Sequence, residues 1–192
     1  MALLITGLVL FFATHFYSAF RTRAEGQDIK SRMGEKAYMG VYSLIALAGF
    51  GLIIWGYNSA PGGDALFVTP VELRWLSALL LLIGFVLLVA AYAPAGHIKR
   101  WVKHPMITAV ALWGLAHLLY GGDLVAVLLF GSFFIYAVID RIALLGRPAP
   151  AFDGKPSEAG DVIAILGGAF LFFAFVYGLH NLLWGIAPVL PF

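Results

Sequence analysis

Residues 74–92 read RWLSALLLLIGFVLLVAAY, and this stretch decides the fold class. Its single charged side chain, Arg74, stands at the first position, and nearly all of the following residues are apolar. A helix rises about 1.5 Å per residue, so it needs about 20 mostly apolar residues to cross the hydrocarbon layer of a membrane. The stretch therefore predicts a transmembrane helix.

Further apolar segments lie on both sides of this one, at residues 3–20, 38–57, 105–120, 124–145 and 162–184. The composition agrees with them, since 62% of the 192 residues are hydrophobic and 11% are charged. A soluble domain is typically about 25% charged and roughly 45–50% apolar. We predict an all-α fold: a polytopic transmembrane helical bundle of about six helices, forming a single domain over residues 1–192.

The basic residues indicate the orientation of this bundle. Eleven of the twelve Lys and Arg residues lie in three short polar stretches, which follow the first, third and fifth apolar segments. The stretches contain Arg21, Arg23, Lys30, Arg32 and Lys36, then Lys99, Arg100 and Lys103, and then Arg141, Arg147 and Lys155. Basic loops stay in the cytoplasm, so both termini are predicted on the outer side, which is the periplasm for a bacterial inner membrane.

The same basic stretches limit which partners the chain is expected to bind. They are too small to indicate nucleic-acid binding, and we expect them to contact anionic lipid headgroups. Cysteine is absent. Any metal must therefore be held by histidine, carboxylate, methionine or backbone oxygen.

Histidines supply most of the chemistry within the apolar segments. Imidazoles inside a bilayer are costly and usually functional, which draws attention to His15, His117 and His180. His97 and His104 lie in or beside the second basic stretch. His104 and His117 differ by about 20 Å in depth on one helix, so they cannot ligate one small ion. By depth alone, His117 pairs with His180 near the outer face, and His15 pairs with His104 or His97 nearer the inner face.

Several of these positions have a second interpretation. His180 can serve only to hydrogen-bond a neighbouring helix, and His97 is expected to be a solvated loop residue. Asp140 and Arg141 can form an ion pair between helices instead of a site. The i, i+3, i+4, i+7 pattern of the last segment indicates a polar face that is better buried against other helices, although its aromatic members also fit an interfacial belt. Its members are Tyr177, His180, Asn181 and Trp184.

A series of short motifs runs through most of the chain. They are KHPM at residues 103–106, LWGLAHLL at 112–119, GD at 122–123, LFGSF at 129–133 and DR at 140–141. His15, Ser18 and Arg21 in the first segment, with GEKAY at residues 34–38, fit the same series. Together these motifs resemble the NnrU family of small integral membrane proteins.

This resemblance implies a cofactor and its ligands. The family name comes from an association with denitrification, and a plant relative, 15-cis-zeta-carotene isomerase, holds haem b between histidines. By that resemblance His15, His117 and His104 are the cofactor-binding candidates, with His15 and His117 as ligands of the haem iron. The isomerase's second ligand has no histidine counterpart near residues 131–132. Either another residue is the second ligand here, or haem is not bound in that way.

Three functions follow as expectations. The first is a membrane protein that binds haem b and acts in nitrogen-oxide metabolism or in haem-dependent isomerase or redox chemistry. The second is a non-enzymatic membrane subunit or assembly factor for a nitrogen-oxide reductase. The third is a membrane methyltransferase, since the His104-Pro105 element resembles that of isoprenylcysteine carboxyl methyltransferase. Arg100 and Arg141 would then lie near the S-adenosylmethionine cosubstrate. The lipid bilayer is the expected surrounding, with a redox partner or a reductase subunit as the protein partner.

Overall fold

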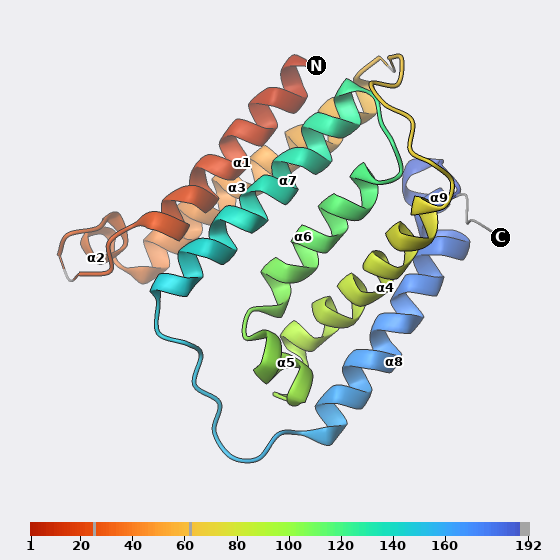
Figure 1. The fold of residues 1–192 in the computed structure, drawn as a ribbon. Helices are drawn as coiled ribbons and strands as arrows, with labels where there is room; N and C mark the ends of the chain where they lie inside the picture. The colour runs from red at the N-terminus through yellow and green to blue at the C-terminus, as the bar shows by residue number, and fades with distance from the viewer. Residues whose placement is uncertain (25, 62, 189–192) are drawn as a thin grey trace. The chain divides into compact units, whose positions relative to one another are not determined.

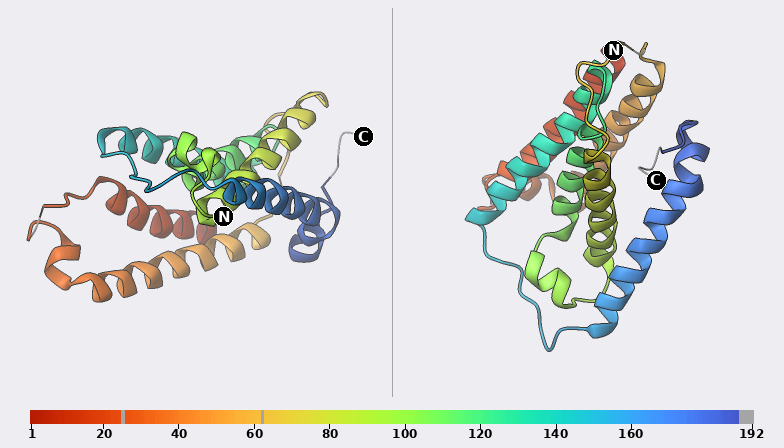
Figure 2. Two further views of the ribbon diagram at one scale, coloured as in Figure 1. Left: turned by 90° about the horizontal axis from the view of Figure 1, so that it is seen from below. Right: turned by 45° about the vertical axis from the view of Figure 1, so that its right-hand side comes forward.

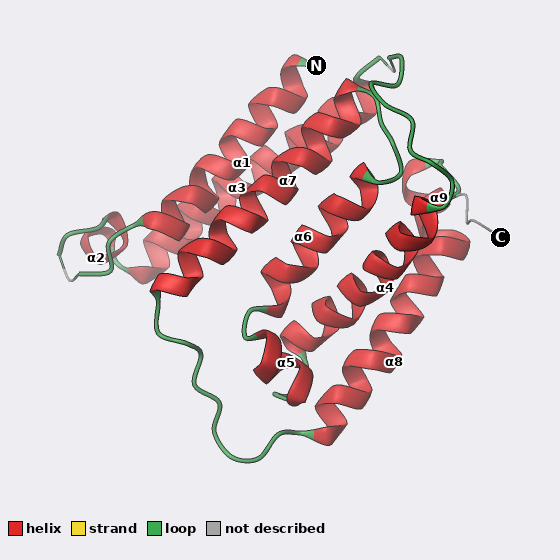
Figure 3. Ribbon diagram, viewed as in Figure 1, coloured by secondary structure: helices red, strands yellow, loops and turns green. Residues whose placement is uncertain are grey.

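The computed structural model describes residues 1–24, 26–61 and 63–188. Helices and the loops between them make up these ranges, and no strand element occurs within them (Figures 1 and 3). The chain forms two compact units, Met1–Gly63 and Asp64–Phe192, which we call the N-terminal and C-terminal units. The expected single domain over residues 1–192 stays a prediction.

The N-terminal unit is a helical hairpin. It contains α1 (Ala2–Phe20), the short α2 (Ile29–Met33) and α3 (Glu35–Ser59). The two long helices lie side by side, and the segment that contains α2 joins them at one end (Figure 2).

Glycines allow the two long helices of this hairpin to approach closely. A methyl group placed on Gly7 would lie 2.6 Å from the backbone nitrogen of Ile53. One placed on Gly56 would overlap the backbone of Leu4. Membrane helices associate without a hydrophobic driving force between them, so close backbone packing at small residues stabilises the hairpin.

Polar contacts close the loop of the hairpin. Arg21 forms an ion pair with Asp28, and the guanidinium also lies 5.8 Å from the centre of the Tyr38 ring. Asp28 caps α2 by accepting a hydrogen bond of 2.8 Å from the backbone nitrogen of Ser31. The hydroxyl of Tyr17, in the last turns of α1, accepts a bond of 3.0 Å from the backbone nitrogen of Ile29. Both ends of the loop are therefore tied to the long helices.

The C-terminal unit is a row of helices in the order α7, α6, α4, α8 (Figure 1). This order differs from the order along the chain, because α8 returns to pack beside α4. The hydroxyl of Ser77 on α4 donates a hydrogen bond of 2.7 Å to the carbonyl of Ala116 on α6 within this row. The elements are α4 (Leu73–Tyr92), α5 (His97–Val102), α6 (Pro105–Leu118), α7 (Leu124–Ala143), the 3₁₀ turn η1 (Leu144–Gly146), α8 (Glu158–Ala174), the π-helical turn η2 (Phe175–Leu179) and α9 (His180–Trp184).

The apolar segments match these helices closely, which confirms the transmembrane helical fold class. Five helical segments are long and apolar enough to cross a membrane, and α6 is a shorter apolar helix. The short α2 and α5 form within basic stretches that carried no helix prediction. The last long helix begins at Glu158, four residues before the predicted start, because the Ser157 hydroxyl caps it with a bond of 3.1 Å from the backbone nitrogen of Gly160. The side on which the termini lie stays a prediction.

Large apolar side chains lie on the outside of these helices. Leu44 on α3 is 70% exposed and Phe170 on α8 is 72% exposed. Soluble proteins rarely expose wide apolar surfaces, whereas lipid chains solvate such surfaces at no cost. The exposure pattern therefore agrees with a multi-pass protein in a bilayer.

A pair of glycine variants in α3 tests the packing of the hairpin. We expect Gly56→Ala to lower the free energy of unfolding in detergent by about 1–3 kcal/mol, because the new methyl group overlaps the α1 backbone. The matched control is Gly51→Ala, since a methyl group there meets nothing within 4 Å. Alanine favours a helix over glycine by about 0.8–1 kcal/mol, so the control should be neutral or stabilising. Equal effects in a thermal unfolding assay would show that the close approach is absent.

Candidate membrane histidine site

His15 lies on α1 in an aromatic environment within the N-terminal unit. Its ring stacks on Phe11, with 4.0 Å between ring centres and 25° between planes, and the Tyr42 ring lies 5.5 Å away. The Nδ1 atom is 2.7 Å from the backbone carbonyl oxygen of Phe11, and the Thr14 hydroxyl oxygen is 3.3 Å from the same nitrogen. The imidazole is half-buried and held in one orientation.

His117 lies near the end of α6 in the C-terminal unit and has a closely similar environment. Its ring stacks on Phe130 of α7, with 4.3 Å between centres and 16° between planes, and the Trp113 ring lies 5.0 Å away. The Nδ1 atom is 2.8 Å from the carbonyl oxygen of Trp113, four residues earlier.

The turn after α6 fixes the end of the helix that carries His117. Gly121 has a φ of 91°, which favours glycine, and Asp123 caps α7 through a bond of 2.9 Å from the backbone nitrogen of Ala126. The carbonyl of Gly122 accepts a bond of 3.0 Å from the backbone nitrogen of Leu66. Gly121, Gly122 and Asp123 therefore form a tight turn between α6 and α7.

The backbone contacts of His15 and His117 define their chemistry. A carbonyl oxygen only accepts hydrogen bonds, so Nδ1 must carry the proton in each ring. In the neutral imidazole the lone pair then lies on Nε2. Histidines that bind metals are commonly oriented in this way, since a hydrogen bond from the other ring nitrogen fixes the tautomer and makes the ligating nitrogen more basic.

His180 shares the C-terminal unit with His117. Its Nδ1 atom is 2.7 Å from the carbonyl oxygen of Ile186, and its ring lies 5.1 Å from that of Trp184. The common depth of His180 and His117 in the membrane stays a prediction.

The polar face predicted for the last segment is not buried as expected. Tyr177 is 70% exposed, and Asn181 and Trp184 are also exposed. The π-helical turn η2 interrupts the regular α-helix directly before His180. The alternative of an interfacial aromatic belt fits the exposed Tyr177 and Trp184.

The remaining candidate, His104, lies at the opposite end of α6 from His117, as the 13-residue spacing requires. His15 belongs to the other unit. Within the described residues, no group of three or more His, Cys, Asp or Glu side chains could hold a metal ion. A haem iron takes only its axial ligands from the protein.

Several polar side chains at the α5 end of the C-terminal unit hold backbone groups. The Asp161 carboxylate accepts bonds of 2.8 and 3.0 Å from the backbone nitrogens of His97 and Ile98, at the start of α5. The Lys99 ammonium group donates to the carbonyls of Ala91 and Ala93 at 2.8 and 3.1 Å, at the end of α4. Sequence reasoning missed this role of Asp161, although an acidic residue beside an apolar segment is a signal that could have indicated it.

Arg100 is also occupied by backbone groups. Its guanidinium donates bonds of 2.9 to 3.0 Å to the carbonyls of Asp153, Gly154 and Lys155. These bonds fix the loop before α8 against α5. Arg100 thus has a structural task, which weakens the methyltransferase interpretation that places it beside a cosubstrate.

His104 lies among charges from the end of α7. Partial burial lowers the pKa of His104 below the usual value for imidazole, and the positive charge of Arg141 lowers it further, while Asp140 opposes the shift. Neither Asp140 nor Arg141 has an ion-pair partner among the described residues. The alternative of an ion pair between helices at this position is therefore absent from the described part of the chain.

Two variants of α7, each replacing a charged side chain by a neutral one of similar size, should shift the pKa of His104 in opposite directions. Arg141→Gln removes a cation and should raise the pKa of His104, whereas Asp140→Asn removes an anion and should lower it. The measurement is a pH titration by NMR of protein with labelled histidines in detergent, with His104→Gln to assign the signal. Shifts of the same sign in both variants would contradict the arrangement.

Comparison with known proteins identifies the family. No curated protein and no solved structure matches the chain. The family model described as NnrU protein matches residues 3–188, which is nearly the whole chain and includes His15, His104 and His117. The chain therefore belongs to the NnrU family.

Proposed function

We propose that this NnrU-family chain is a membrane protein that binds haem b through His15 and His117 and acts in nitrogen-oxide metabolism. The supporting observation is the shared geometry of the two imidazoles. Each donates Nδ1–H to the carbonyl four residues earlier, so the lone pair lies on Nε2, the atom through which an imidazole binds iron.

The surroundings of both rings suit this role. Phe11 and Tyr42 position the imidazole of His15, and Trp113 and Phe130 position that of His117. Flat aromatic side chains also pack well against the face of a porphyrin. The apolar helices around them exclude water, as helical bundles do at cofactor sites.

The family and the environment support the link to nitrogen oxides. When bound, haem supplies one-electron chemistry or a coordination position for a small ligand. Nitric oxide is small and uncharged, so it enters an apolar membrane site without the cost of burying a charge. The association of the NnrU family with denitrification points to the same substrate class.

An absorption spectrum of the protein, purified in mild detergent after expression with sufficient haem, tests the proposal. We expect a Soret band, with α and β bands that sharpen on reduction by dithionite. His15→Ala and His117→Ala should each lose most of the haem. Losing a ligand weakens binding by more than the roughly 10- to 100-fold that losing a ligand's hydrogen-bond partner costs.

His180→Ala is the matched control, because this histidine also donates Nδ1–H to a carbonyl. It should keep its haem, and circular dichroism should show that all three variants are folded. A colourless wild-type protein would overturn the proposal and leave the reductase subunit as the better interpretation. Loss of haem in His180→Ala, with retention in His15→Ala, would show that the ligand assignment is wrong.

We also propose that both termini face the periplasm of a bacterial inner membrane, with the three basic stretches in the cytoplasm. Alkaline phosphatase fused after the C-terminus should be active, because this enzyme folds only outside the cytoplasm, while green fluorescent protein at the same point should stay dark. Fusions after residue 148, in the third basic stretch, should show the reverse. A fluorescent C-terminal fusion would contradict this orientation.

A further inference from the structure

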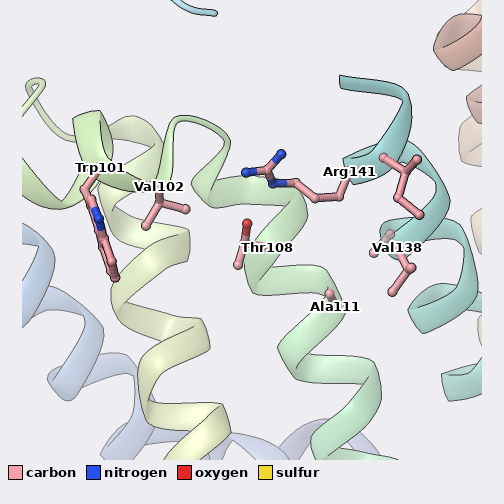
Figure 4. A pocket seen from close by; sticks show the side chains of 8 residues that line it. Trp101, Val102, Thr108, Ala111, Val138 and Arg141 are labelled. Atoms are coloured by element: carbon pink, nitrogen blue, oxygen red, sulfur yellow. The ribbon is translucent and has the colours of Figure 1, made fainter. Parts of the chain in front are cut away.

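A cavity lies at the inner end of the C-terminal unit, between the end of α5, the start of α6 and the end of α7. Its volume is about 360 Å³, within the usual range of ligand pockets of roughly 300–1,000 Å³. Trp101 and Val102 line it from α5, Thr108 and Ala111 from α6, and Ala137, Val138, Arg141 and Ile142 from α7 (Figure 4). It contains none of the membrane histidines.

The lining is apolar apart from one cation and one hydroxyl. Figure 4 shows the Arg141 side chain extending from α7 over the start of α6, with Thr108 below its guanidinium. Asp140 precedes Arg141 on the same helix, where successive side chains point about 100° apart, and it does not line the cavity.

Arg141 differs from several other cations of the chain, whose side chains have partners. Lys99 and Arg100 donate to backbone carbonyls, and Arg21 in the N-terminal unit pairs with Asp28. The Arg141 guanidinium has no hydrogen-bond or ion-pair partner anywhere in residues 1–24, 26–61 and 63–188. A cation beside an apolar cavity is complementary to an anion, and the planar guanidinium suits the oxygens of a phosphate.

The position of the cavity indicates what carries that anion. Arg141 belongs to the third basic stretch, at the predicted cytoplasmic end of α7. Trp101, on the short α5 that precedes α6, is 86% exposed, and an exposed tryptophan beside a membrane helix is typical of the level of the lipid headgroups. Val138 and Ile142 on α7 are also exposed, so the apolar wall of the cavity continues toward the lipid phase. A ligand there meets a cation at the headgroup level and apolar side chains below it.

We propose that this cavity binds an anionic phospholipid, with its phosphate at Arg141 and its first acyl segment against Ala111 and Val138. The Thr108 hydroxyl lies nearby and donates its own hydrogen bond, of 3.0 Å, to the carbonyl of His104. Basic pockets between membrane helices on the cytoplasmic side commonly bind anionic headgroups. The site shares no residue with the proposed haem ligands, and it does not depend on haem.

Native mass spectrometry of the full chain in detergent tests this site, with phosphatidylglycerol as the probe and phosphatidylcholine as the neutral comparison. The wild type should retain phosphatidylglycerol in preference to phosphatidylcholine. Arg141→Gln should weaken phosphatidylglycerol binding by roughly tenfold, the effect of one lost charge-assisted contact. Ala111→Leu keeps every charge and fills the apolar wall, so it should weaken the binding of both lipids.

Lys103→Gln is the matched control, since it removes a positive charge from the same end of the unit without changing the cavity lining. It should bind phosphatidylglycerol as the wild type does. An equal loss in Lys103→Gln and Arg141→Gln would show only diffuse attraction and overturn the proposal. Wild-type binding by both Arg141→Gln and Ala111→Leu would also overturn it. Complete displacement by millimolar inorganic phosphate would identify free phosphate, and not a lipid, as the ligand.

Discussion

The constraint on which the structure depends is that a lipid phase offers no partner for a backbone N–H or C=O group. Each unpaired group within the hydrocarbon costs several kcal/mol, so helix ends need partners supplied by the protein. Several polar side chains of this chain pair with backbone groups at helix ends. Asp161 caps α5, Lys99 satisfies the end of α4, and Arg100 holds the carbonyls of the following loop. Only 11% of the residues are charged, so few charged side chains remain for binding a ligand or a partner.

The same constraint accounts for how the membrane histidines are hydrogen-bonded. An imidazole on a membrane helix can donate to the carbonyl one turn earlier, and His15 and His117 both do so. This bond satisfies Nδ1 and leaves a lone pair on Nε2. The contact that makes a histidine tolerable in lipid is therefore also the contact that fixes its tautomer. Arg141 shows the complementary case of a polar group for which the protein supplies no such partner among the described residues.

Sequence patterns predicted the helices better than their arrangement. The long apolar runs and the opposite positions of His104 and His117 on α6 were both predicted, because each depends on local composition or helix rise. The order α7, α6, α4, α8 was not predicted, since apolar surfaces in lipid do not specify their neighbours. The interruption of the last helix by a π-helical turn was not predicted, because such a turn has no clear sequence signal. The pairing of Asp161 with α5 joins positions more than 60 residues apart, which no local pattern can indicate.

The self-contained packing of the hairpin has a consequence for how the protein is made. All the contacts described between α1, α2 and α3 come from residues before position 64, including the glycine contacts and the Arg21–Asp28 pair. Domains generally fold as units in the order of their synthesis, and membrane helices insert before they associate. The hairpin can therefore assemble in the bilayer while the ribosome is still translating α4. His15 is then oriented before the part of the chain that carries His117 exists.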